Sequence, residues 1–169
     1  DLDRGAAYAA WIVGDRDLAF DPYEQALGMM YDALDQLLLN ATIWNYSASN
    51  RNDPRIGDGW NQEDLSIYSI DQSDGHDGGG RAVRGFARPF VRAAQGRIAA
   101  VAFNRTTGEF VADIDIDPRV NAATELVLPK ALFGAKPSVT ADGASIDVCE
   151  GVAWVSTGAA GRIRIVCRP

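Results

Sequence analysis

The strongest constraint on the fold of this chain is a change in hydrophobic periodicity near residue 92. From there to the C-terminus, apolar and polar residues alternate with a period of two, and turn residues recur roughly every eight to twelve positions. Short strands at this spacing are typical of an antiparallel β-sandwich. The predicted strands cover residues 98–103, 109–116, 123–128, 138–141, 145–149, 152–156 and 161–167.

The first part of the chain has helical periodicity instead. A helix is predicted over residues 22–39, with Asn40 as the residue that ends it. Its start combines an N-cap, a first-turn proline and a capping-box acid, which are Asp21, Pro22 and Glu24. Its apolar face comprises Tyr23, Leu27, Met30, Leu34, Leu37 and Leu38.

A short apolar strand, residues 41–46, is predicted directly after this helix. A helix followed by a strand is half of an α/β repeat, and a single repeat cannot close a core. We therefore predict an α/β plus all-β chain, in which residues 1–90 need more sheet from elsewhere and residues 91–169 form the sandwich. A long loop over residues 47–80 and a short helix over residues 81–90 complete the first part.

Charge is distributed unevenly along the 169 residues. The formal net charge is −7 and the isoelectric point about 4.6, so a nucleic-acid partner is not expected. Residues 1–77 carry a net −11 and residues 78–169 a net +4. Four arginines at helical spacing are predicted to form a solvated face or ion pairs with the acidic half, or else a patch for anionic headgroups; they are Arg81, Arg84, Arg88 and Arg92.

Both cysteines, Cys149 and Cys167, lie in predicted strands near the C-terminus. If those strands pair, the two sulfurs can form a disulfide, which would favour a secreted or otherwise exported protein. The alternative is two free thiols in the core. The single histidine, His76, lies in a Gly/Asp-rich loop far from either cysteine, so neither a metal nor a cofactor is expected.

Residues 39–72 contain Leu-Asn-Ala-Thr-Ile-Trp-Asn-Tyr and later Gly-Asp-Gly-Trp-Asn-Gln-Glu-Asp-Leu-Ser-Ile-Tyr-Ser-Ile-Asp-Gln. This run resembles the C-terminal part of endoglycoceramidase-like enzymes of glycoside hydrolase family 5. Residues 79–90, Gly-Gly-Arg-Ala-Val-Arg-Gly-Phe-Ala-Arg-Pro-Phe, are similar to the family's passage into its C-terminal β-sandwich. The resemblance implies a (β/α)8 TIM barrel whose seventh helix is residues 22–39 and whose eighth strand is residues 41–46.

The same resemblance implies a retaining β-glycosidase acting on glycosylceramide-like glycolipids or oligosaccharides through a pair of Glu residues. Neither of the family's catalytic Glu motifs occurs here, so no catalytic residue is assigned to this chain, and its partner would be an N-terminal chain carrying the rest of the barrel. The chain begins Asp1-Leu2-Asp3 without an initiator methionine. We therefore expect processing or cleavage before Asp1.

Five residues are candidates for substrate binding: Trp44, Asn45, Trp60, Asn61 and Glu63. The resemblance places a sugar-platform tryptophan at Trp44, where an indole face would pack against the C–H groups of a sugar ring; the alternative is a buried core tryptophan. Asn45 could bond a sugar hydroxyl or be structural. Trp60 and Asn61 could line the aglycone side or anchor their loop, and Glu63 is more simply a loop anchor.

A second interpretation is a non-catalytic carbohydrate- or surface-binding β-sandwich module, with contact to a membrane surface as one possibility. The helix and strand over residues 22–46 argue against it, because a free module has no use for a single barrel repeat. Fold class alone does not decide between the two functions.

Overall fold

The computed structural model describes residues 6, 9–10, 12–42 and 82–169. Most of the predicted strand over residues 41–46 lies outside the described residues. The whole of the predicted loop over residues 47–80 also lies outside them. The chain divides into two compact units, Asp1–Met29 with Ala41–Phe86, and Met30–Asn40 with Ala87–Pro169. No helix in the described part of the chain is both long enough and apolar enough to cross a membrane.

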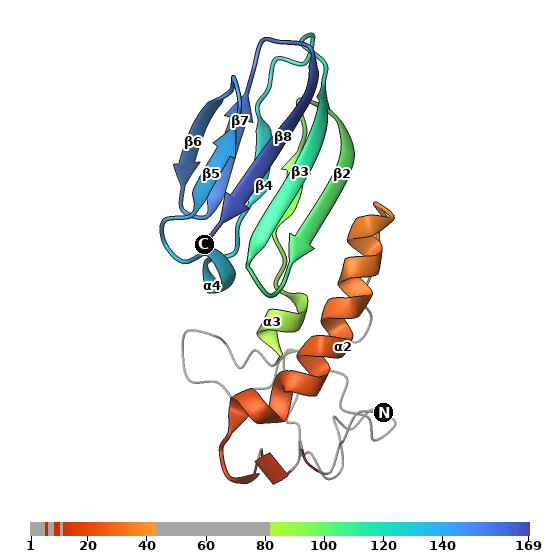
Figure 1. The fold of residues 1–169 in the computed structure, drawn as a ribbon, viewed down its shortest axis with the longest axis vertical. Coiled ribbons are helices and arrows are strands. Elements are labelled where there is room, and N and C mark those ends of the chain that lie inside the picture. The colour runs from red at the N-terminus through yellow and green to blue at the C-terminus, as the bar shows by residue number, and fades with distance from the viewer. Residues whose placement is uncertain (1–5, 7–8, 11, 43–81) are drawn as a thin grey trace. The chain divides into compact units, whose positions relative to one another are not determined.

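The second unit contains a β-sandwich of two four-stranded antiparallel sheets that face each other (Figure 1). One sheet has the order β1-β4-β7-β6, with strands Phe90–Ala93, Thr124–Val127, Val152–Ser156 and Ser145–Cys149. The other has the order β2-β3-β8-β5, with strands Gly96–Asn104, Glu109–Ile116, Gly161–Arg168 and Ser138–Ala141. The predicted antiparallel sandwich is confirmed.

The core lies between the two sheets and follows from the period-two alternation. In β3 every second residue is buried, and β4 and β7 alternate in the same way. Burying a large apolar side chain stabilises the fold by about 1.5–3 kcal/mol. The core residues are Phe110, Ala112, Ile114, Ile116, Leu126, Leu128, Phe133, Ala153, Val155, Ile165 and Cys167.

The predicted helix over residues 81–90 is shorter than expected. Helix α3 covers only Val83–Phe86, and β1 begins at Phe90. The cause is Pro89, because the residue before a proline is pushed out of the helical region towards extended conformations. Helix α4, Lys130–Phe133, was not predicted; Pro129 precedes it, and Gly134 follows at φ 67°.

Helix α2 covers Arg16–Gln36 and so begins earlier than predicted. Its N-cap is Asp15, whose Oδ1 accepts a hydrogen bond from the Leu18 N–H at 3.0 Å. Pro22 lies inside the helix, and Asp21 accepts a bond from the Gln25 side chain instead of capping. The predicted start was wrong because Asp15 supplies a cap before the proline is reached.

The end of α2 also differs from the prediction. Leu38 has φ 50°, and the Leu39 N–H donates to the Leu34 carbonyl at 2.9 Å while the Leu38 N–H donates to Asp35 at 3.1 Å. This pair of bonds is the Schellman arrangement, which normally favours glycine at the left-handed position. Leucine occupies that position here, and the helix ends before Asn40.

The two cysteines are free thiols, so the predicted disulfide is not formed. Cys149 is exposed on β6 and Cys167 is buried on β8, which belong to opposite sheets. The two strands do not pair with each other, and only Cys167 points into the core. Burial raises the pKa of the Cys167 thiol from 9.0 to about 12, because the thiolate would lose its hydration.

We predict that the native chain exposes one reactive thiol at about pH 8, and that a second appears only on unfolding. The measurement is labelling with a chromogenic disulfide reagent before and after addition of guanidinium. Cys149→Ser should abolish the native reaction, whereas Cys167→Ser should leave it unchanged. Finding no free thiol in the unfolded, unreduced chain would instead show that the two cysteines are bonded.

Candidate functional site

All five predicted substrate residues lie outside the described residues, and so does His76. Their roles remain predictions. Within the described part of the chain, no group of three or more His, Cys, Asp or Glu side chains is arranged to hold a metal ion. The chemistry that can be built from described residues lies on the sandwich, in one pocket and on the outer faces of both sheets.

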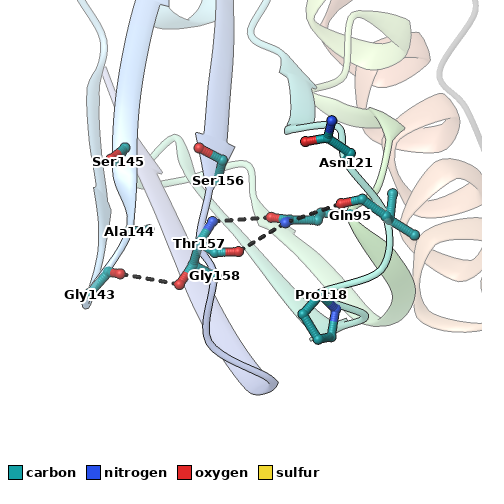
Figure 2. Close-up of a pocket in the computed structure, with 10 residues that line it drawn as sticks. Gln95, Pro118, Asn121, Gly143, Ala144, Ser145, Ser156, Thr157 and Gly158 are labelled. Atoms are coloured by element: carbon teal, nitrogen blue, oxygen red, sulfur yellow. Dashed lines mark hydrogen bonds between the residues drawn. The ribbon is translucent and has the colours of Figure 1, made fainter.

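The pocket lies at one end of the sandwich and has a volume of about 530 Å³ (Figure 2). Its residues come from the β1–β2, β3–β4, β5–β6 and β7–β8 connections and the adjoining ends of β6 and β7. They are Gln95, Pro118, Val120, Asn121, Gly143, Ala144, Ser145, Ser156, Thr157 and Gly158. None is ionisable, so the pocket can bind polar groups but cannot supply the carboxyl pair of a retaining glycosidase.

Gln95 holds this pocket together. Its side chain is buried and bonds both ways to the Thr157 backbone, with Nε2 donating to the carbonyl at 2.9 Å and Oε1 accepting from the N–H at 3.1 Å (Figure 2). The Gln95 backbone N–H donates to Thr124 Oγ1 at 3.0 Å. The Thr157 hydroxyl in turn donates to the Gly143 carbonyl at 3.3 Å. These bonds fix the rim and leave the hydroxyls of Ser145 and Ser156 and the Asn121 amide free of described bonds to other residues.

On the outer face of the sheet β1-β4-β7-β6, two hydrogen bonds connect three side chains. The Trp154 Nε1–H donates to Glu125 Oε1 at 3.2 Å, and Arg92 Nε donates to Glu125 Oε2 at 2.7 Å. The hydrogen bond from Arg92, and to a smaller extent that from Trp154, holds the pKa of Glu125 below its usual range. Glu125 is therefore ionised at neutral pH and holds the indole in one orientation.

The outer face of the other sheet is a ladder of alternating charges on β2, β3 and β8. Arg164 bonds Asp113 through Nε and Nη2, both at 2.8 Å, and Arg162 Nε bonds Asp115 at 2.7 Å. Arg97 also pairs with Asp115, and Arg168 pairs with Glu109. Hydrogen bonds from Arg164 and Arg162 lower the pKa values of Asp113 and Asp115 respectively. The carboxylates are thus occupied by neighbouring arginines, which makes this face a structural one.

A buried arginine joins the C-terminal part of α2 to the sandwich within one compact unit. The Arg88 side chain is only 7% exposed, and its Nη2 lies 2.5 Å from Asp35 Oδ2 and 2.8 Å from Asp32 Oδ1. Its guanidinium stacks 4.9 Å from the centre of the Phe103 ring. Arg105 adds a second pair to Asp32 at 3.2 Å. The predicted ion pairing with the acidic half is therefore confirmed for Arg88.

The four arginines predicted at helical spacing do not share one helical face. Arg84 lies in α3, Arg88 between α3 and β1, and Arg92 in β1, while Arg81 is outside the described residues. The prediction of a helical arginine patch for anionic headgroups was therefore wrong, again because Pro89 ends the helix. Sequence reasoning also missed Trp154 and Gln95. The alternation of Ala153, Trp154 and Val155 was a usable signal, because it predicts that the indole faces outward.

Comparison with known proteins identifies the sandwich. Residues 88–165 match the glycoside hydrolase family 5 C-terminal domain. These residues of the sandwich form a glycoside hydrolase family 5 C-terminal domain. It is distantly homologous to two glucosylceramidases, from Cryptococcus neoformans var. grubii (30% identical over 128 residues) and from Rhizopus delemar (30% over 120 residues). The matches cover 65% and 62% of this chain and 17% of each relative.

Solved structures extend the similarity to nearly the whole chain. The chain resembles Cryptococcus neoformans sterylglucosidase 1, in its structure with tris, at a TM-score of 0.78 and 26% identity over 99% of this chain and 26% of that one. Endo-glycoceramidase II from Rhodococcus sp. shares the fold, with a TM-score of 0.58 and 20% identity over 89% of this chain and 30% of that one. The chain therefore spans about a quarter of the sterylglucosidase and a smaller share of the two glucosylceramidases.

We predict that Arg88→Met lowers the free energy of unfolding by about 2 kcal/mol. Breaking a buried ion pair costs more, but Asp32 and Asp35 are 29% and 25% exposed and can regain water. Urea unfolding followed by far-UV circular dichroism measures the change. Arg119→Met is the matched control, because Arg119 pairs with Asp117 while 89% exposed, and it should leave the unfolding curve unchanged. Equal curves for both variants would contradict the role of Arg88.

Stability should fall as the pH is lowered from about pH 5 to pH 2, in part through Asp113 and Asp115. Their pKa values are lower in the folded chain, so the unfolded chain binds protons first as the pH falls, and the stabilisation present at neutral pH is lost. Asp113→Asn should flatten this pH dependence in urea unfolding. Asp142→Asn, at an exposed turn position, should keep the slope, and an unchanged slope in Asp113→Asn would refute the prediction.

Proposed function

We propose that this chain is the C-terminal part of a retaining β-glycosidase that hydrolyses the β-glycosidic bond of a glycolipid of the glucosylceramide type. The observation that carries the proposal is similarity over 99% of the chain to a sterylglucosidase, together with sequence similarity to two glucosylceramidases. All three are named for glucosides of lipids. The similarity extends beyond the sandwich, which supports the same assignment for the residues before it.

The catalytic Glu pair is expected in the part of the enzyme that precedes this chain. Retaining cleavage needs two carboxyl groups about 5 Å apart, one as acid/base and one as nucleophile. In the described residues the pocket has no carboxyl group, and the carboxylates of the β3–β8 ladder are held by arginines. We therefore expect the chain alone to be inactive and the remainder of the barrel to be its partner.

Exposed apolar residues in and after α2 support a larger assembly. Met29 in α2, and Leu37 and Leu39 just after the helix, are 62%, 67% and 56% exposed. Exposed large apolar side chains often mark a surface that another element covers. The assignment of residues 22–39 and 41–46 to a barrel supplies such an element, and it stays a proposal. We also propose that the protein is exported and that its substrate site contacts a membrane surface.

A binding module without catalysis is the competing function. The observation in its favour is Trp154, an aromatic side chain on the outer face of a sheet with polar groups around it. This function does not exclude the first, because one enzyme can carry both a catalytic domain and a glycan-binding surface. The two separate experimentally, since only the first depends on residues outside the sandwich.

We predict that Trp44→Ala, in the enzyme containing this chain and the preceding barrel, lowers kcat/KM for a fluorogenic glucosylceramide about tenfold, the effect of losing roughly 1.4 kcal/mol of ring stacking. Phe90→Ala, at an exposed position of the sandwich, is the control and should leave kcat/KM for the same glucosylceramide unchanged. The 169-residue chain by itself should release no sugar.

Two outcomes would contradict this proposal. Hydrolysis by the isolated chain would place the catalytic carboxylates within it. Inactivity of the whole enzyme on every glucolipid offered, with a correctly folded barrel, would remove the glycosidase assignment and leave the binding module.

A further inference from the structure

Trp154 lies at the centre of a row of side chains that crosses the sheet β1-β4-β7-β6. Trp154 on β7 pairs with Glu125 on β4 and with Asp147 on β6, and Arg92 of β1 bonds Glu125. The neighbours of Trp154 along β7, Ala153 and Val155, are fully buried in the core. Because side chains alternate along a strand, the indole points away from the core.

Hydrogen bonds fix the orientation of the Trp154 indole in the chain without ligand. Its only polar atom, Nε1, is bonded to Glu125 at 3.2 Å, and Glu125 is bonded to Arg92 at 2.7 Å. A side chain fixed in this way loses little conformational entropy when a ligand packs on it. Trp154 is half-buried, so part of its ring is exposed on this face and can contact a ligand.

The polar pocket continues this face of the sheet. Ser156 lies two residues after Trp154 on β7, on the same side of the strand and about 7 Å away, and it pairs with Ser145 of β6. Both serines line the pocket, with Asn121 across from them (Figure 2). The Trp154 ring thus lies beside a pocket lined by hydroxyl and amide groups. One short oligosaccharide is long enough to contact both.

This combination fits a sugar better than a lipid or another apolar group. A hexose whose hydroxyls are equatorial has an apolar C–H face, which packs on an aromatic ring, and a polar edge, which needs hydrogen-bond partners. An acyl chain on Trp154 would remove water from Arg92, Glu125 and Asp147 without replacing it, which is unfavourable. The neutral, polar lining of the pocket suits hydroxyl groups and has no charge to attract an anion.

We propose that Trp154 and the polar pocket beside it form a glycan-binding site for oligosaccharides of β-linked hexoses. One sugar ring stacks on the Trp154 indole, and the next unit bonds the hydroxyls of Ser145 and Ser156. This site does not depend on the proposed catalytic function, because it is built entirely from residues of the sandwich.

The test is titration of the 169-residue chain with cellotetraose, followed by calorimetry and by the indole N–H signals in two-dimensional NMR. The chain has four tryptophans, and the signal of Trp154 is the one missing in Trp154→Phe. We expect a dissociation constant of about 1 mM or tighter and a shift of the Trp154 signal. Maltotetraose, which has α-linkages, should bind at least tenfold more weakly.

Three variants locate the site. Trp154→Ala should weaken cellotetraose binding at least tenfold, and Trp154→Phe, which keeps a ring but loses the bond to Glu125, should weaken it less. Phe90→Ala is the matched control. Phe90 is 49% exposed on the same sheet, opposite Val127, and lies outside the row that contains Trp154, so binding should not change. If Trp154→Ala does not fold, Trp154→Phe and Ser156→Ala still test the site.

Several results would overturn the inference. They are absence of binding at 10 mM cellotetraose (about ten times the expected constant), equal binding by Trp154→Ala in a folded chain, and equal binding of maltotetraose. A shift confined to another indole signal, with Trp154 unaffected, would also overturn it. Such a shift would place sugar contact in the N-terminal part of the chain, where the proposed substrate residues lie.

Discussion

The ion pairs of the buried Arg88 guanidinium are the contacts on which the arrangement of the sandwich and the segment Met30–Asn40 depends. The Arg88 side chain is 7% exposed, and among the described residues its charge is paired with Asp32 and Asp35 of the C-terminal part of α2. Its stacking on Phe103 of β2 fixes the other side. The segment Met30–Asn40 therefore belongs to the same compact unit as the sandwich, although some fifty residues of chain separate them.

Pro89 follows Arg88 directly and decides how the chain enters the sandwich. The proline ends helical conformation, and the chain passes straight into β1 at Phe90. Gln95 then closes the other end of β1 by bonding Thr124 and Thr157. A buried charge at one end of the strand and a buried amide at the other thus hold β1 in place. Buried polar groups left without partners would be costly, so both contacts specify one arrangement.

The two outer faces of the sandwich differ in what they can do. On β3 and β8 each carboxylate is matched by an arginine across the strands, and few groups are left for a ligand. On the other sheet, the ion pair between Arg92 of β1 and Glu125 of β4 orients the Trp154 ring of β7. The uncharged hydroxyls of Ser145 and Ser156 lie nearby. The same fold therefore has one outer face whose carboxylates are paired with arginines and one outer face that we propose binds glycans.

Sequence alone predicted the strands of the sandwich well, because alternation is a local property that each strand carries by itself. Seven of the eight strands of the sandwich were expected near their observed positions. Only β1 was missed, because the local pattern over residues 81–90 suggested a helix that reaches into it. The start of α2 was missed for a similar reason. Pro22 is a strong local signal for a first turn, but the cap supplied by Asp15 determines the observed start.

Local sequence patterns were therefore sufficient for seven strands of the sandwich, for the alternation of inward and outward residues along them, and for the resemblance to family 5. The pairing of the strands is known only from the tertiary structure. This pairing also fixes the location and the partners of each side chain whose role depends on a residue far away in sequence. The tertiary structure placed Cys149 and Cys167 on opposite sheets, buried Arg88 against two aspartates, and put Trp154 between Glu125 and Asp147. Pairing between strands far apart in sequence is a non-local property that no single segment encodes.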